Sequence, residues 1–155
     1  MLEVAILIGF QGAGKSTFRA QRFEGTHALV SKDLLRNNRR PERRQQHLIA
    51  EALASGKSVV VDNTNPSVEE RASTIDTARA LGARVVGYFF ESPLEECATR
   101  NNARPEGARV PDVGLFATAK RFVRPSTAEG FEELFTVRTL PDFRFEVRPY
   151  EETPR

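Results

Sequence analysis

Residues 9–16 near the start of the chain combine glycines, a lysine and a serine at a spacing suited to phosphate binding. They read GFQGAGKS and fit the pattern Gly-x4-Gly-Lys-Ser. Glycines let backbone N–H groups approach phosphate oxygens, and a following helix points its positive N-terminal end at the same anion. Lys15 would supply charge to the β and γ phosphates, and the Ser16 hydroxyl suits Mg²⁺. The pattern predicts a P-loop that binds ATP with Mg²⁺.

A second polar group follows the next short apolar run and contains Asp33 and Arg36. Ligands of open α/β sheets bind at the carboxyl ends of strands, which would put Asp33 on the same edge as the P-loop. A carboxylate there can take a proton from an attacking hydroxyl, and Arg36 could hold an acceptor phosphate. Asp33 has a second interpretation as an N-cap of the following helix, and the two roles are compatible.

Arginines crowd the stretch after Asp33, and a solvated helix face is the ordinary explanation for such a run. Beside a phosphate site, the run also favours contacts with an anionic ligand. Each arginine that touches a strand phosphate would steepen the salt dependence of binding by about one unit, and single strands suit a shallow basic groove. The arginines of this stretch are Arg36, Arg39, Arg40, Arg43 and Arg44.

Two further motifs extend the candidate site. An apolar run ends at Asp62, which resembles a Walker-B position that touches Mg²⁺ directly or through water, although a capping role in a turn is the alternative. Arg100 and Arg104 lie four residues apart, before a loop with Pro and Gly at 103–111. A lid arginine there would stabilise the charge of a transferred phosphoryl group, whereas a plain surface pair is the alternative.

These motifs, in this order, resemble the kinase domain of polynucleotide 5′-hydroxyl kinases, and the animal polynucleotide kinase/phosphatases most. The resemblance covers roughly residues 6–135, and its strings DNTNP and TAEGF are more specific than the P-loop. Residues 37–46 match nothing that can be aligned, so their arginines are assigned on physical grounds alone. The matching strings are GFQGAGKSTF at 9–18, KDxL at 32–35, GKxVxVDNTNP at 56–66, RNNxR at 100–104, VPD at 110–112 and PxTAEGF at 125–131.

The resemblance implies Mg²⁺-dependent transfer of the γ-phosphate of ATP, or another NTP, to the 5′-hydroxyl of DNA or RNA. Asp33 would be the general base, Arg36 would grip a 3′-phosphate of the acceptor, and Arg104 with Arg100 would contact the donor phosphates. The expected catalytic residues are Lys15, Asp33 and Arg104. The expected nucleotide-binding residues are Gly12, Ala13, Gly14, Lys15, Ser16, Thr17, Arg100 and Arg104. Those expected to bind substrate are Arg36, Asp62, Arg39 and Arg40, and those expected to hold Mg²⁺ are Ser16 and, through water, Asp62.

The elements that must position these residues alternate between strands and helices. This alternation predicts an α/β fold of the P-loop kinase type, with a central parallel sheet, helices on both faces and an arginine-bearing lid. Strands are predicted at 2–8, 28–30, 58–62, 84–90, 135–140 and 143–147. Helices are predicted at 15–23, 34–54 with an interruption near Pro41, 67–81, 94–102 and 112–123. In the helix at 67–81 the expected apolar face consists of Val68, Ala72, Ile75, Ala78 and Leu81.

Composition narrows the class of protein. The 155 residues are 39% hydrophobic and 28% charged, which is typical of one globular domain, expected at 1–150 with a frayed tail at 151–155. Net charge is only +2 and does not by itself indicate nucleic-acid binding. The lone Cys97 suits packing and cannot form an internal disulfide. Without a leader or a long apolar run, the expected location is cytoplasmic, with no membrane partner.

Two alternative functions stay open. A kinase of a small-molecule hydroxyl, such as that of a sugar, nucleoside or antibiotic, would use the same P-loop and Asp33 without needing the basic stretch at 36–44. A nucleotide-dependent binding module or ATPase would have no acceptor. Most familiar kinases of the resembled family carry a phosphatase domain or another fused module, which these residues do not include, so the kinase would act alone or beside separate repair proteins such as a phosphatase or a ligase.

Overall fold

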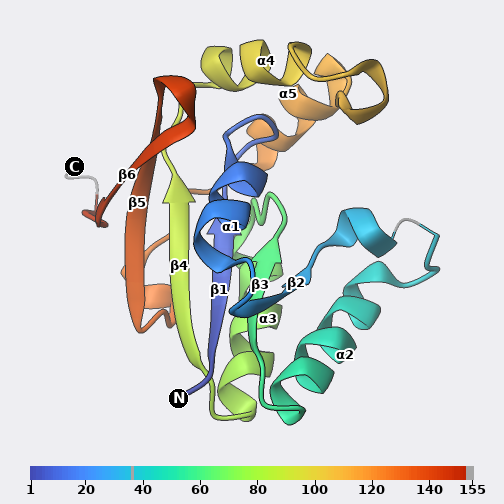
Figure 1. Ribbon diagram of the computed structural model, residues 1–155, viewed down its shortest axis with the longest axis vertical. Helices are drawn as coiled ribbons and strands as arrows, with labels where there is room; N and C mark the ends of the chain where they lie inside the picture. The colour runs from blue at the N-terminus through green and yellow to red at the C-terminus, as the bar shows by residue number, and fades with distance from the viewer. Residues whose placement is uncertain (36, 153–155) are drawn as a thin grey trace.

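Six strands form one sheet in the order β2-β3-β1-β4-β5-β6 in the computed structural model, which describes residues 1–35 and 37–152 (Figure 1). The first five strands are parallel, as predicted, whereas β6 pairs antiparallel with β5 at one edge. The connection from β5 to β6 is the three-residue turn Pro141–Phe143, too short for the crossover that parallel pairing needs. The strands are β1 Glu3–Ile8, β2 His27–Val30, β3 Ser58–Asp62, β4 Arg84–Phe90, β5 Glu133–Leu140 and β6 Arg144–Pro149.

Helices cover both faces of the sheet, as the alternating pattern predicts. Side chains of α1 pack on one face, and those of α2 and α3 pack on the other. Figure 1 shows α4 and α5 above the carboxyl ends of the strands, where a lid was expected. Across the described residues, every helix is too short or too polar to cross a membrane. The helices are α1 Lys15–Phe23, α2 Pro41–Ala54, α3 Val68–Ala80, α4 Leu94–Asn102 and α5 Asp112–Arg121.

The central strand β1 is buried on both sides because parallel sheets of this kind carry helices on each face. Ile6 and Ile8 contribute to the cluster beneath α2 and α3, while Ala5 and Leu7 contribute to the cluster beneath α1. All four side chains have no exposed surface. The P-loop therefore starts from the most deeply fixed strand of the molecule.

The predicted helix at 34–54 is wrong in its first part. The chain forms a single 3-10 turn, η1, at Lys32–Leu35, and α2 begins only at Pro41, which occupies its first turn. Proline suits the first turn of a helix and disfavours helical backbone at the residue before it. The segment that carries Asp33 is thus a short turn and not a helix.

The predicted core face of α3 is also wrong at both ends. Val68 and Leu81 are 40% and 50% exposed, whereas Arg71 and Thr74 are fully buried. Polar partners from elsewhere in the chain turn this helix so that an arginine faces inward. The domain boundary at 150 stays a prediction, although Glu152 accepts hydrogen bonds of 2.7 and 3.0 Å from the backbone and hydroxyl of Thr127.

Candidate functional site

The P-loop forms between β1 and the start of α1, as its pattern predicts. The ammonium group of Lys15 donates hydrogen bonds to the carbonyl oxygens of Gly9 and Phe10, at 2.9 and 2.7 Å. Gly12 and Gly14 have φ values of 81° and 100°, a left-handed region in which glycine avoids steric strain. The loop therefore folds back over Lys15, and the N-terminus of α1 opens toward any bound phosphate.

Lys15 is nearly buried, and this affects its charge. Burial lowers the pKa of Lys15 to about 8, while Asp62 and, more weakly, Asp33 raise it and Arg104 lowers it. The three named side chains were all predicted to belong to the site, and each lies close enough to act on Lys15 through its charge. A buried ammonium group of this kind binds phosphate strongly because the negative charge compensates its lost hydration.

Asp62 lies at the end of β3, beside the P-loop. The Ser16 hydroxyl donates to the Asp62 carboxylate at 2.9 Å. Arg19 was not predicted as a site residue, but its Nε lies 3.8 Å from the same carboxylate and has no hydrogen-bond partner among the described residues. Its position one turn after Ser16 was the only signal in the sequence. A hydroxyl and a carboxylate in contact supply the oxygen ligands that Mg²⁺ prefers.

The loop after Asp62 is joined to the P-loop by buried hydrogen bonds. The amide of Gly9 donates to the carbonyl of Thr64 at 3.0 Å. Asn65 has a φ of 47°, which asparagine tolerates better than most residues, and its side chain donates to the carbonyl of Leu7 at 2.7 Å. The DNTNP string therefore fixes where the P-loop and β3 stand relative to each other.

Arg71 and Glu129 support this loop from below, a role that sequence reasoning missed. The guanidinium group of Arg71 donates to both Glu129 carboxylate oxygens, at 2.8 and 3.0 Å, and to the carbonyl of Asn65 at 2.9 Å. Arg71 has no exposed surface. Glu129 belongs to the TAEGF string, whose specificity in the resemblance thus has a structural counterpart.

Asp33 lies on the η1 turn, beyond the carboxyl end of β2. Ser31 caps this turn, because its hydroxyl oxygen accepts from the Asp33 amide at 3.2 Å and its carbonyl accepts from the Leu34 amide at 3.1 Å. The Asp33 side chain is exposed and forms no hydrogen bond or ion pair with any described residue. The capping alternative for Asp33 is therefore filled by Ser31, and the carboxylate is free to act elsewhere.

Of the three arginines expected to bind substrate, the structure describes two. Arg36 lies outside the described residues. Arg39 and Arg40 are exposed just before α2. A hollow of about 500 Å³ beside them is lined by Asp33, Leu34, Asn37 and Asn38. The hollow beside Asp33 is therefore open and mostly polar, and the exposed Arg39 and Arg40 follow its lining residues in the chain.

The lid contacts the P-loop directly. Arg100 on α4 donates to the carbonyl of Gly12 at 3.2 Å, and the Gln11 amide donates to Thr118 on α5 at 2.9 Å. The buried Asn101 side chain donates to the carbonyl of Val110 at 2.6 Å and accepts from its amide at 3.0 Å, which closes the arginine loop on itself. Of the two lid arginines predicted from the sequence, Arg100 therefore contacts the P-loop, and Arg104 acts on Lys15 through its charge.

The remaining expected nucleotide-binding residues lie around the first turn of α1. Thr17 is half-buried there, and the carbonyl of Ala13 accepts from the Thr139 hydroxyl at 2.7 Å. A cavity of about 220 Å³ opens beside them, between α4 and the β5–β6 turn, and its lining includes Arg100, Thr139 and Phe143.

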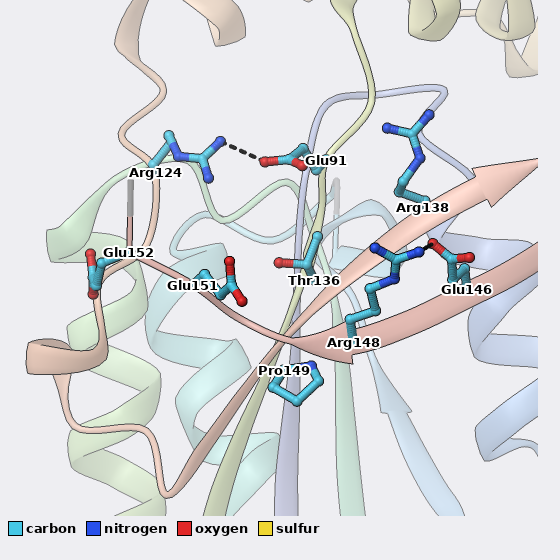
Figure 2. Close-up of a pocket in the computed structure, with 9 residues that line it drawn as sticks. All are labelled: Glu91, Arg124, Thr136, Arg138, Glu146, Arg148, Pro149, Glu151 and Glu152. Carbon is cyan, nitrogen blue, oxygen red and sulfur yellow. Dashed lines mark hydrogen bonds and ion pairs between the residues drawn. The ribbon is translucent and has the colours of Figure 1, made fainter. Parts of the chain in front are cut away.

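A larger hollow of about 450 Å³ lies away from the P-loop, over β5 and β6. Figure 2 shows that two of its arginines are paired with glutamates: Arg124 with Glu91 at 3.0 Å and Arg148 with Glu146 at 2.8 Å. Four carboxylates outnumber three guanidinium groups in its lining. This hollow is therefore unsuited to a phosphate and is not part of the candidate site.

Comparisons with known proteins agree with this geometry. The bifunctional polynucleotide phosphatase/kinase of Schizosaccharomyces pombe is 31% identical over 148 residues, which cover 91% of this chain and 35% of that protein. The chain thus spans about a third of the length of this curated relative.

Two solved structures share the fold at lower identity. A fungal RNA kinase is 17% identical with a TM-score of 0.62, covering 91% of this chain and 76% of that one. The APS kinase CysC of Mycobacterium tuberculosis, in complex with AMPPNP and APS, is 23% identical with a TM-score of 0.62, covering 91% and 89%. These likenesses confirm the predicted α/β fold of the P-loop kinase type.

One family model matches most of the chain, over residues 4–125, and its description is AAA domain. The match includes the P-loop, the η1 turn, the DNTNP string and both lid arginines. The chain belongs to this AAA domain family.

Proposed function

We propose that this chain transfers the γ-phosphoryl group of ATP to the 5′-hydroxyl end of a DNA or RNA strand. The observation that carries the proposal is the exposed carboxylate of Asp33, which is bonded to no described residue and lies on the same edge of the sheet as the buried Lys15. The likeness to a protein named polynucleotide phosphatase/kinase supports a polynucleotide end as the acceptor.

The donor would bind with its phosphates at the P-loop and its base in the cavity beside Arg100. Lys15, the N-terminus of α1 and the loop amides would hold the β and γ phosphates. The APS kinase CysC, which shares this fold, is in complex with AMPPNP, and this supports a nucleotide triphosphate as the ligand. Arg100 and Arg104 would approach from the lid and stabilise the charge of the transferred group.

Mg²⁺ fits the oxygen pair of Ser16 and Asp62. No group of three or more His, Cys, Asp or Glu side chains in residues 1–35 and 37–152 is arranged to hold a metal ion. A cation here would therefore take its remaining ligands from phosphates and water, as Mg²⁺ commonly does. When bound, it would supply positive charge that neutralises the phosphate oxygens.

The reaction would be an in-line displacement. The 5′-oxygen of the acceptor attacks the γ-phosphorus, the bond from that phosphorus to the β–γ bridging oxygen breaks, and ADP leaves. Asp33 accepts the proton of the attacking hydroxyl. Arg39 and Arg40, exposed beside the open hollow, would attract the strand by its phosphates. Arg36 would hold the acceptor phosphate nearest the reacting end.

Label transfer from γ-labelled ATP tests this proposal. The acceptors are 5′-hydroxyl oligonucleotides of DNA and RNA, the same oligonucleotides already phosphorylated at the 5′ end, and a panel of sugars, nucleosides and antibiotics. We expect labelling of the 5′-hydroxyl strands alone. Labelling only of small compounds would show a small-molecule kinase, and phosphate release without any labelled acceptor would show an ATPase.

A substitution of Asp33 tests the mechanism in the same assay. Asp33→Asn removes the base while keeping the shape, so transfer should fall by about 10²- to 10⁴-fold with ATP affinity unchanged. Asp76→Asn, which replaces an exposed aspartate on α3, is the matched control and should be fully active. Equal rates for the two variants would show that Asp33 is not the base.

A further inference from the structure

Asn63 occupies a junction between the two halves of the candidate site. It follows Asp62 at the end of β3, and its side-chain carbonyl accepts from the backbone amide of Lys32 at 2.8 Å. Lys32 begins the η1 turn and directly precedes Asp33. The pairing of β2 with β3 ends at Val30 and Val61. The Asn63 side chain therefore connects the segments that follow these two strands, beyond their last paired residues.

The orientation of the Asn63 side chain is set by its partners. A backbone amide can only donate, so the oxygen of Asn63 must face Lys32. The Asn63 nitrogen then donates to the side-chain oxygen of Gln45 on α2 at 2.7 Å. Gln45 is 1% exposed, and its own nitrogen lies 3.5 Å from the fully buried hydroxyl of Thr74 on α3. Buried groups thus fix the amide nitrogen of Asn63, while its amide oxygen holds the η1 turn.

We propose that Asn63 is a positioning residue that holds the η1 turn, and with it the Asp33 carboxylate, at a fixed place relative to the P-loop. The inference rests on the function proposed above for Asp33. No side chain of a described residue restrains the Asp33 carboxylate directly, so its place depends on how the η1 turn is held. Ser31 accepts from the Asp33 amide and Asn63 from the preceding amide. The ion pair of Lys32 with Glu42 at 2.6 Å and the buried Leu35 hold the two ends of the turn, but neither fixes the backbone next to Asp33 directly. Displacing a reacting group by about 1 Å costs on the order of a hundredfold in rate.

Asn63→Ala removes the anchor and keeps Asp33. We expect kcat for phosphoryl transfer to fall on the order of ten- to a hundredfold, with the affinity for ATP unchanged. Thr77→Ala is the matched control, because it also removes one part-buried side-chain hydrogen bond, from the Thr77 hydroxyl to the Ser73 carbonyl at 3.0 Å within α3, and that bond includes no residue of the η1 turn. It should transfer phosphate at the wild-type rate.

A double-mutant cycle separates positioning from simple loss of structure. If Asn63 acts through Asp33, Asn63→Ala should change kcat by less than about twofold in the Asp33→Ala background, where no base remains to be misplaced. Effects of the two substitutions that multiply in full would overturn the proposal. Only labelled acceptor is counted, so that hydrolysis of ATP does not add to the small transfer rates of these variants.

Hydrogen exchange tests the anchor without relying on any acceptor. The amides of residues 31–35 should exchange faster in Asn63→Ala than in wild type, and at the wild-type rate in Thr77→Ala. Equal exchange in wild type and Asn63→Ala would overturn the proposal. If the wild-type protein labels no acceptor at all, the proposed function fails, and this measurement still decides whether Asn63 fixes the turn.

Discussion

The donor side and the acceptor side of the site are built differently. On the donor side, Lys15 is buried and bonded to two carbonyls, and the Ala13 carbonyl is held by Thr139. On the proposed acceptor side, Asp33 and the arginines Arg39 and Arg40 are exposed, and the hollow that Asp33 lines is open. The donor side therefore consists of groups that are already held in place before a ligand binds. The acceptor side consists of charged groups that are exposed to solvent.

The difference suits the two ligands proposed. ATP presents the same phosphates at every turnover, so a rigid loop loses little free energy in reorganisation on binding. A polynucleotide end varies in sequence and flexibility, and exposed arginines can meet its phosphates without a fixed partner geometry. Substitutions on the donor side should therefore have all-or-none effects, whereas those at the exposed arginines should be graded.

Gly12→Ala should have the largest effect, because an added Cβ would overlap the carbonyl oxygen of Cys97 on α4 and the φ of 81° is strained for alanine. We expect ATP affinity to fall on the order of a hundredfold as the loop shifts. Gly56→Ala is the matched control, since Gly56 has a φ of 84° but open space around an added Cβ. Titration calorimetry of both variants measures the difference, and equal affinities would show that the loop is not rigid.

The pH dependence of ATP binding tests the burial of Lys15. With a pKa of about 8 against the ordinary 10.5, free Lys15 loses its proton above pH 8, and bound phosphate must restore it. Affinity should therefore fall by up to about tenfold per pH unit above pH 8, with proton uptake visible in calorimetry in two buffers. Lys15→Met should bind weakly and show no such slope. A flat wild-type profile up to about pH 9.5 would contradict the lowered pKa.

The same shift affects the stability of the protein without nucleotide. The unfolded chain holds the lysine proton more tightly than the folded one, so it binds more protons between pH 8 and 10.5. The contribution of Lys15 to the free energy of unfolding should therefore rise with pH across that window. Thermal unfolding of wild type and Lys15→Met over the window separates this contribution from other groups.

Arg39→Gln and Arg40→Gln should have the smallest effects. Each should reduce the slope of log affinity against log salt by about 0.7 for a single strand, without changing ATP affinity. Arg148→Gln is the control, because this exposed arginine lies on β6 and is paired with Glu146. An unchanged slope for both variants would remove this stretch from the acceptor path, and the comparison of the two sides would then rest on Asp33 alone.

Much of the donor side was predictable because its signals are local. The bounds of α1 and β4 and the end of β3 at Asp62 match the predictions, since apolar runs and glycine spacing act over a few residues. The strand β6 was predicted at 143–147, but its antiparallel direction was not, because an edge strand has the same local pattern in either direction. The site residues themselves, Lys15 and Asp33 among them, remain predictions about function that the experiments above address.

The supports of the site were not predictable, because they join residues far apart in the chain. The spacing of Val68, Ala72 and Ile75 indicated an apolar face, and Ile75 is indeed buried, yet Arg71 is buried on α3 as well because Glu129 pairs with it. Similarly, no periodicity points to Arg19 beside Asp62. Pairing energies of this kind depend on the assembled fold, which a local pattern does not contain.

Glu129 and Thr139 both lie beyond residue 125, where the match to the family ends. Glu129 holds Arg71 beneath the Asn65 loop, and Thr139 holds the back of the P-loop at Ala13. During translation, the GKS segment leaves the ribosome long before either support exists. A nascent chain must therefore reach β5 before the P-loop and the Asn65 loop are both supported, although Lys15 and both lid arginines have by then already been synthesised.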